Sequence, residues 1–142
     1  MPYASLPDFV DAFGTQLSIE LTNLEDPTAT TVNTAAFDRA AADGDGLINS
    51  YLAGRYRLPL ETVPPLILGI ALDIYRYKLG RNAEEKDVRQ RYDDALKTLR
   101  EIATGVLDLG LPTADNSPRP GSPVYTSPPS VFNRDTLKDY GL

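Results

Sequence analysis

Residues 64–79 have the sequence PPLILGIALDIYRYKL, and this stretch decides the fold. Proline needs no amide hydrogen in the first turn of a helix, so Pro64 and Pro65 predict a helix start, with Thr62 as the cap. Gly80 predicts that the helix ends near Leu79. Apolar side chains cover most of its circumference, which is typical of a helix at the centre of a core or of an assembly.

Two short helices are predicted near the beginning of the chain. The first covers residues 5–13, where Ser5 suits the cap and Asp8 stands in the position that completes a capping box. Gly14 suits its end, and the second helix then covers residues 15–23. One face of the second helix carries two leucines one turn apart, Leu17 and Leu21.

A longer helix is predicted over residues 34–56, because apolar residues recur there at spacings of three and four. Gly44 and Gly46 each cost about 1 kcal/mol in a helix interior, so they indicate either close helix packing or a break into two helices. Pro59 disfavours helical backbone at Leu58 and thus separates this helix from the next.

The last helix is predicted over residues 83–104, ended by Gly105. Residues 106–111 have the composition of a short strand but no clear partner strand. The sequence therefore predicts an all-α fold of four to five helices, a small helical bundle. Pairs of opposite charge four residues apart are expected on the outer face of the last helix, namely Glu85–Arg89, Asp87–Arg91 and Lys97–Glu101.

Proline marks a change of organisation after residue 111. Six of the 12 prolines lie in residues 112–142, which excludes a long helix or a central strand there. We interpret residues 1–111 as a helical domain and residues 112–142 as an extended C-terminal arm. Its apolar residues are separated along the proline frame and are the candidate partner-binding residues, namely Val124, Tyr125, Val131, Phe132, Leu137 and Tyr140.

The composition excludes several classes of function. The 142 residues include no Cys and no His, which removes thiolate chemistry, Cys-type zinc sites and the commonest general base. Residues 1–111 hold 17 acidic and 11 basic side chains, and residues 112–142 hold three of each. An acidic body argues against binding to DNA phosphates. We expect no catalytic residue, no metal site, no cofactor and no membrane segment.

Two acidic features have structural interpretations. Residues 43–46, DGDG, resemble part of a calcium loop, but Ala41 and Leu52 stand where two essential ligands should be. Asp73 lies inside the most apolar helix, where an ionised carboxylate needs a partner. The candidate partners of Asp73 are Arg76, Arg55 and Arg57.

The middle of the chain is similar to a known family. Residues 48–60, INSYLAGRYRLPL, resemble the signature of the Mu-like phage neck proteins, although usual members have an acidic residue where Asn49 stands. The resemblance spans residues 3–111 and leaves the arm outside. Further agreement lies at Tyr3-Ala4, Phe13-Gly14, VPPL (63–66), DIYRY (73–77), RYDDA (91–95) and LREIATG (99–105).

This resemblance implies a head–tail connector, the adaptor of the phage neck. Members are helical and form a ring of about twelve subunits beneath the portal, and they extend the channel through which DNA leaves the capsid. The implied partners are other copies of the chain, the portal protein and the next neck or tail protein, while genomic DNA passes without specific binding. The implied location is the neck of the virion, after synthesis in the bacterial host cytoplasm.

Two other classes of function stay open on the sequence. One is a different neck component, a stopper or a tail terminator, which usually carries substantial β-structure. The other is a small phage regulator or enzyme. A helical structure favours the adaptor over the first of these alternatives.

Overall fold

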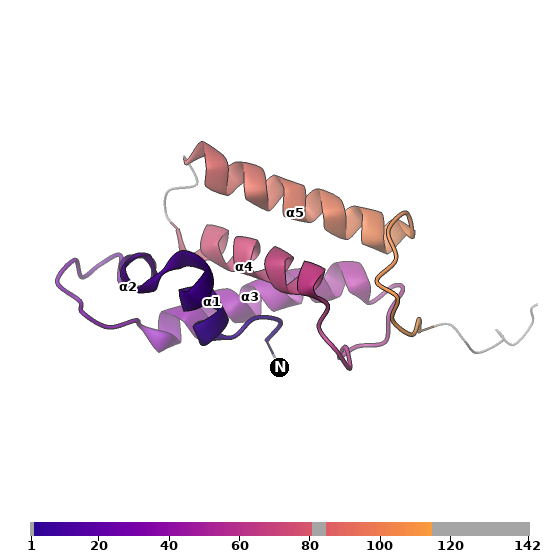
Figure 1. The fold of residues 1–142 in the computed structure, drawn as a ribbon, viewed down its shortest axis with the longest axis horizontal. Helices are drawn as coiled ribbons and strands as arrows, with labels where there is room; N and C mark the ends of the chain where they lie inside the picture. The colour runs from indigo at the N-terminus through magenta and orange to yellow at the C-terminus, as the bar shows by residue number, and fades with distance from the viewer. Residues whose placement is uncertain (1, 81–84, 115–142) are drawn as a thin grey trace, which may run out of the picture.

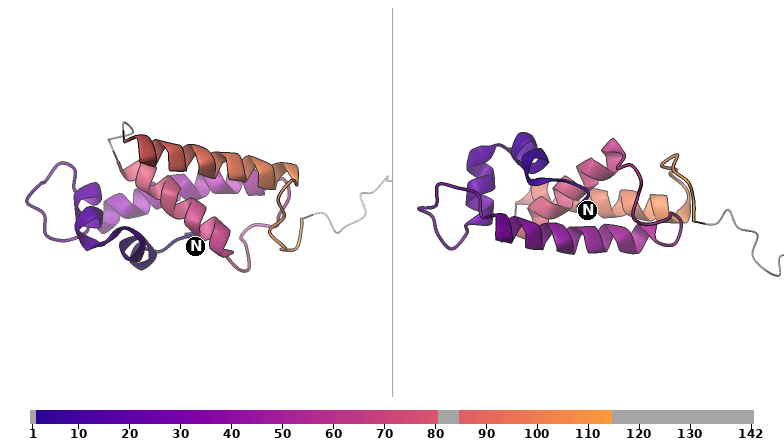
Figure 2. Two further views of the ribbon diagram at one scale, coloured as in Figure 1. Left: turned by 45° about the horizontal axis from the view of Figure 1, so that its top comes forward. Right: turned by 90° about the horizontal axis from the view of Figure 1, so that it is seen from below.

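The computed structural model describes residues 2–80 and 85–114, and the regular structure within them is helical apart from one isolated bridge. Three long helices pack against one another with successive helices running in opposite directions, and two short helices pack on them (Figures 1 and 2). This confirms the predicted all-α class. The helices are α1 (Leu6–Phe13), α2 (Thr15–Thr22), α3 (Thr34–Leu52), α4 (Pro65–Leu79) and α5 (Lys86–Thr104).

The beginning of α1 is set by the predicted cap. The Ser5 hydroxyl accepts a hydrogen bond from the Asp8 amide, and the Asp8 carboxylate accepts one from the Ser5 amide at 2.8 Å. The capping box is therefore confirmed. It orients α1 so that Phe9 is fully buried, with its ring edge-on to the ring of Phe37 at a centroid distance of 5.5 Å.

The helix α2 is confirmed, but its most buried side chains are polar. Ser18 and Thr22 are buried, whereas Leu17 and Leu21 are half-buried. The Ser18 hydroxyl donates to the Gly14 carbonyl oxygen at 2.7 Å, and the Thr22 hydroxyl donates to the Ser18 carbonyl oxygen at 2.8 Å. Both hydroxyl groups are satisfied within the helix, so small polar residues can lie against the core.

The helix α3 is continuous through both glycines, which settles the choice between one helix and two. It ends at Leu52 rather than at Tyr56, so the predicted end was wrong. The amides of Arg55 and Tyr56 both donate to the Leu52 carbonyl oxygen, at 3.0 and 2.8 Å, and this closes a turn that leaves the helix axis. Tyr56 is still buried because the turn directs it into the body.

The helix α4 confirms the predicted centre of the core. It begins at Pro65 with Pro64 as its cap, so Thr62 is not the capping residue. Proline disfavours helical backbone in the residue before it, and Pro64 accordingly has φ −63° and ψ 150°, which delays the helix start past Thr62. The residues of α4 that are buried are Ile67, Ile70, Ala71, Ile74, Tyr75 and Leu79.

The helix α5 begins at Lys86, later than the predicted Ala83, which itself lies outside the described residues. Gly105 ends it at φ 84°, a left-handed conformation that favours glycine. Two residues of the predicted charge pairs contact α4 instead: Glu85 pairs with Arg76 at 3.7 Å, and Arg91 pairs with Asp73 at 3.7 Å. The buried residues of α5 are Val88, Ala95, Leu99 and Ile102.

Tyr75 of α4 joins α3 and the N-terminal segment. Its hydroxyl donates to the carboxylate of Asp45 and accepts a hydrogen bond from the Ala4 amide at 3.4 Å. Burial, followed by the bond to Asp45, raises the pKa of Tyr75, so the phenol stays protonated and remains a donor. The Tyr3 hydroxyl donates to the side-chain oxygen of Asn49 one turn further along α3.

Gly44 allows α3 to approach α4 at this point. A Cβ atom at Gly44 would lie 2.7 Å from two ring carbons of Tyr75 and 3.2 Å from Cγ2 of Ile74. A Cβ atom at Gly46, on the exposed side of the same helix, would meet nothing within 4 Å. Close packing therefore accounts for Gly44, and no packing requirement accounts for Gly46.

We predict that these two glycines respond oppositely to alanine. Gly44→Ala forces the Tyr75 ring away and is expected to lower the free energy of unfolding by about 1–3 kcal/mol. Gly46→Ala removes only backbone freedom from the unfolded chain and is expected to raise it by up to ~1 kcal/mol. Urea unfolding followed by circular dichroism measures both, and equal effects of the two substitutions would contradict the packing argument.

Candidate assembly surface

The six predicted arm residues lie outside the described residues. The structure describes the chain as far as Ala114, so Val124, Tyr125, Val131, Phe132, Leu137 and Tyr140 stay predictions. What it does describe is the base of the arm, residues 105–114, and the end of the body to which this base is attached.

Tyr56 holds the base of the arm. Its hydroxyl donates to Oδ1 of Asp108 at 3.1 Å and accepts a hydrogen bond from the Leu109 amide at 3.0 Å. Tyr56 also forms an isolated antiparallel bridge with Thr113, and the Ala114 amide donates to the Arg55 carbonyl oxygen at 2.9 Å. Residues 106–111 therefore form no strand, because the chain pairs with the body only at this one bridge.

Arg55 completes the attachment. Its guanidinium donates to the Ile102 carbonyl oxygen at 3.2 Å, near the end of α5, and lies 3.5 Å from the carboxylate of Asp108. The left-handed backbone at Gly105 favours glycine, and a Cβ atom there would lie 2.8 Å from Nη1 of Arg55, so a side chain would have to displace the guanidinium. Hydrogen bonds to the Gly110 amide and the Tyr56 hydroxyl lower the pKa of Asp108, which keeps this carboxyl ionised.

Sequence reasoning missed this group of residues. Arg55 and Tyr56 belong to the stretch that resembles the phage family, which marked them as important. Nothing in the local spacing connects them with Asp108, which is 52 residues from Tyr56. The connection requires the long helices to bring the ends of α3 and α5 together.

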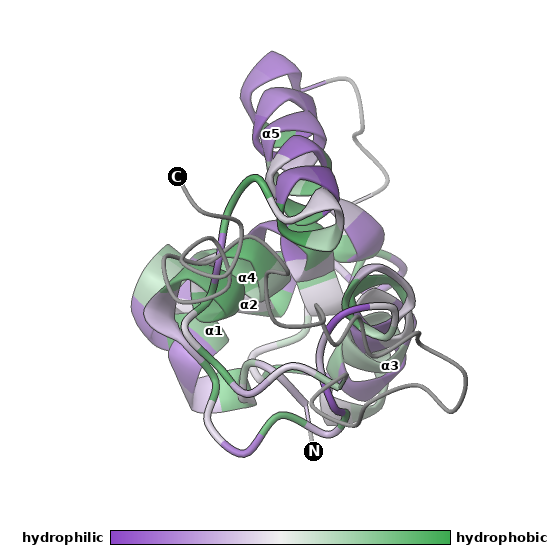
Figure 3. Ribbon diagram, turned by 90° about the vertical axis from the view of Figure 1, so that its right-hand side faces the viewer, coloured by the Kyte–Doolittle hydropathy of each residue, from purple (hydrophilic) through white to green (hydrophobic). Residues whose placement is uncertain are grey.

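Three of the four large apolar side chains that are exposed in the described residues lie at the same end of the body, and Leu24 lies beside the loop that follows α2. The large apolar residues exposed in the described part of the chain are Leu24 at 44%, Val63 at 36%, Leu66 at 42% and Val106 at 79%. Val63 and Leu66 flank the start of α4, and Val106 follows the end of α5. Figure 3 looks onto this end and shows a largely hydrophobic α4 beside a largely hydrophilic α5.

A groove between α4 and α5 begins at Leu66 and reaches Asp73. Asp73 pairs with Arg91 of α5 at 3.7 Å, so the predicted partners Arg76, Arg55 and Arg57 do not form this ion pair. Arg55 pairs with Asp108 instead. Burial raises the pKa of Asp73, and Arg91 and then Arg76 partly offset this effect.

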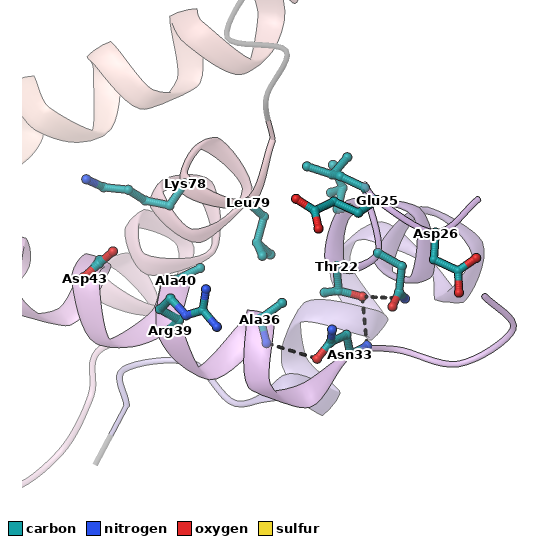
Figure 4. A pocket seen from close by; sticks show the side chains of 13 residues that line it. Thr22, Glu25, Asp26, Asn33, Ala36, Arg39, Ala40, Asp43, Lys78 and Leu79 are labelled. Atoms are coloured by element: carbon teal, nitrogen blue, oxygen red, sulfur yellow. Dashed lines mark hydrogen bonds between the residues drawn. The ribbon is translucent and has the colours of Figure 1, made fainter. Parts of the chain in front are cut away.

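The opposite end of the body carries a polar hollow of about 430 Å³ (Figure 4). Arg39, Asp43 and Lys78 line it, and it lies beside the loop that follows α2. Within it the Thr22 hydroxyl accepts a hydrogen bond from the Asn33 amide at 3.0 Å, which closes the loop between α2 and α3. The Thr22 hydroxyl and the side chain of Asn23, which donates to the Thr31 carbonyl oxygen at 2.8 Å, are engaged in holding the loop.

The calcium-like residues 43–46 form part of the regular helix α3 rather than a loop. The carboxylate of Asp45 binds Tyr75 and the amide of Tyr3, and Asp43 lines the polar hollow. Over residues 2–80 and 85–114, no group of three or more acidic side chains is arranged to hold a metal ion. In the same residues, no helix is both long and apolar enough to cross a membrane.

Comparison with known proteins identifies the family. Residues 3–126 match the family model described as Bacteriophage Mu, Gp36. The Mu-like prophage FluMu protein gp36 of Haemophilus influenzae is 35% identical over 115 residues, which cover 80% of this chain and 82% of the relative. Gene product J of Escherichia phage Mu is 28% identical over 102 residues, which cover 70% of this chain and 72% of the relative.

These matches are to proteins of a phage and of a prophage, and they extend over most of the helical body. The chain belongs to the phage Mu Gp36 family. The resemblance to a Mu-like phage family is thereby confirmed. The match extends past residue 111 to residue 126, so the family pattern includes the first part of the arm.

We predict that Tyr56→Phe loosens the base of the arm. The substitution removes the hydroxyl shared by Asp108 and the Leu109 amide and is expected to cost about 1–3 kcal/mol of unfolding free energy. Hydrogen exchange at the Leu109 amide is expected to speed up. Tyr77→Phe is the control, because the Tyr77 ring stacks on Tyr92 at a centroid distance of 3.9 Å and this contact survives the change. Unchanged exchange at Leu109 would contradict the assigned role of Tyr56.

We predict a pH-dependent effect of Asp73→Asn. A raised pKa means that the folded chain holds this proton more tightly than the unfolded chain, so Asp73 lowers stability as the pH rises through that pKa. The neutral amide is therefore expected to raise the melting temperature at pH 7 and to leave it nearly unchanged at pH 3. The exposed Asp93→Asn is the control, and a lower melting temperature of Asp73→Asn at pH 7 would refute the argument.

Proposed function

We propose that the chain is a structural head–tail connector of the phage neck, with no enzymatic activity. In this proposal the chain forms a ring of about twelve copies beneath the portal protein, extends the channel for DNA and joins head to tail. It acts in the neck of the virion after synthesis in the bacterial host cytoplasm. Its partners are other copies of the chain, the portal protein and the next neck or tail protein.

The observation that carries this proposal is the distribution of charge over the helical body of a phage family member. Residues 1–56 hold eight acidic and two basic side chains, residues 57–111 hold nine of each, and residues 112–142 hold three of each. The whole net charge of −6 thus belongs to the part that contains α1, α2 and α3. The exposed carboxylates of this part include Asp11, Glu20, Asp38 and Asp43.

An acidic surface suits a conduit for DNA. Like charge repels the phosphates, so DNA can pass along the wall without being held, whereas a basic wall would bind it. In the proposed ring the part with α1, α2 and α3 lies toward the channel. The electrically neutral part with α4 and α5 lies toward neighbouring proteins.

The helical structure favours an adaptor among the neck components. A stopper or a tail terminator is expected to carry substantial β-structure, and the regular structure of residues 2–80 and 85–114 consists of helices and one bridge. A small phage regulator or enzyme is the remaining alternative. Tight binding of a nucleotide or a metal ion by a monomeric chain would favour it.

The arm supplies the proposed contact with the portal or with the next ring. Its apolar residues are separated by prolines, which suits an extended segment that binds along a partner surface. Each contact adds little by itself, but a ring carries one arm on every copy, so the contacts act together.

We predict that deletion of residues 115–142 separates folding from assembly. The deletion keeps Thr113 and Ala114, which bond to the body, so the helical circular dichroism spectrum is expected to persist. We expect that the truncated chain no longer co-purifies with portal rings. We also expect that phage carrying the truncation give a yield of infectious particles that is lower by at least about tenfold. Normal particle yield would refute the role of the arm, and a full-length chain that forms no ring with the portal would refute the connector proposal.

A further inference from the structure

The groove between α4 and α5 is an apolar surface that the described residues leave open. It has a volume of about 370 Å³, and Leu66, Gly69, Ile70 and Ala95 supply its apolar lining. Leu66 is 42% exposed, and a Cβ atom at Gly69 would meet nothing within 4 Å. The helix α4, which is apolar on nearly all sides, therefore has an exposed apolar surface at its start, beside the exposed Val63.

The chain itself continues from the same end of the molecule. Ala114 is bonded to Arg55 at the end of α3, close to where α4 begins and α5 ends (Figure 1). Nine residues separate Ala114 from Val124, and at about 3.1 Å per residue they reach roughly 30 Å. The helix α4 has 15 residues and is therefore about 22 Å long, so the reach of the segment to Val124 exceeds the length of this helix.

The family match covers only the first part of the arm, and this part is the candidate for binding in the groove. The match ends at residue 126, directly after Val124 and Tyr125, and leaves out the second apolar pair, Val131 and Phe132. Residues 115–126 thus belong to the pattern that the family shares, as the helical body does. Because the family shares this segment together with the helical body, we expect the segment to pack on that body.

The charge of Arg119 and the prolines of residues 115–126 also suit binding in the groove. The rim of the groove carries the carboxylates of Asp73 and Asp94 and the guanidinium of Arg91, which leaves one net negative charge. Residues 115–126 carry two charges, the carboxylate of Asp115 at their start and the guanidinium of Arg119, so Arg119 is the group that suits the acidic rim. Prolines at 118, 120 and 123 restrict the backbone at their own positions, which lowers the entropy lost on docking.

We propose that residues 115–126 fold back into the groove between α4 and α5 of the same copy, with Val124 and Tyr125 on Leu66 and Gly69. The segment closes the helical domain, and Arg119 lies at the acidic rim. Residues 127–142, with the second apolar pair, remain available for partners. This inference concerns the single copy and stands or falls independently of the ring and the portal.

The absence of cysteine from the native chain gives a direct test. The full-length double variant Leu66→Cys/Val124→Cys is equilibrated in a glutathione redox buffer, and its thiols are counted before and after reduction. Docking within one copy is expected to give a disulfide within one chain, with an effective thiol concentration at least about tenfold above that of a freely tethered pair. The matched control is Leu66→Cys/Leu137→Cys, which places the second thiol in the part of the arm beyond the family match.

Each outcome decides the proposal. A disulfide within one chain that is favoured at least about tenfold over the control supports it, because the shorter tether of Val124 alone gives a smaller preference. Equal effective concentrations in the two variants would show that the segment has no preferred place on the body and would overturn it. Disulfide-linked dimers would overturn it as well, because the groove would then hold the segment of a second copy. A parallel variant, Val63→Cys/Val124→Cys, gives the same readout with Leu66 intact.

Discussion

The approach of α3 to α4 at Gly44 is the contact on which the rest of the structure depends. Because Gly44 has no side chain, the Tyr75 ring lies against the backbone of α3, edge-on to Phe37 at a centroid distance of 5.8 Å. The Tyr75 hydroxyl then reaches Asp45 and the amide of Ala4. Because Gly44 has no Cβ atom, the side chain of Tyr75 can hold α3, α4 and the N-terminal segment together.

The second organising contact lies at the C-terminal end of α3. Arg55 and Tyr56 leave the helix in a tight turn and bind the chain that returns from α5. The helix α3 is therefore fixed near its middle by Tyr75 and the N-terminal segment, and at its C-terminal end by Tyr56 and the base of the arm. Both fixed points use a tyrosine hydroxyl that bridges a carboxylate and a backbone amide, so a small all-α body gains directional bonds in addition to apolar packing.

Much of the fold could be predicted because its signals are local. Ser5, Pro65 and Gly105 mark helix ends through their own backbone preferences, and the apolar spacing of α3 and α4 marks their buried faces. The errors arise where distant contacts decide. Tyr56 pairs with Thr113, which is distant in the sequence, and the partner of Asp73 comes from α5 rather than from its own helix. Thr62 failed as a cap for a local reason, since consecutive prolines impose extended backbone at Pro64.

The candidate site was predictable only in part. Composition and proline content located the arm, and the stretch from residue 48 to residue 60 pointed to the correct family. The residues that attach the arm were not predictable, because Asp108 and Arg55 meet only after three helices have packed. Asn49 shows how a departure from a family pattern can be neutral: its side-chain oxygen accepts the Tyr3 hydroxyl bond, which a carboxylate oxygen would accept as well.

The attachment at Tyr56 also determines how the molecule responds to mechanical load. A pull on the chain beyond residue 114 acts first on the bond between the Ala114 amide and Arg55 and on the bridge from Thr113 to Tyr56. Force therefore passes into the C-terminal end of α3 before it reaches Gly105. As long as these bonds hold, traction on the arm loads α3 before it loads the C-terminal end of α5.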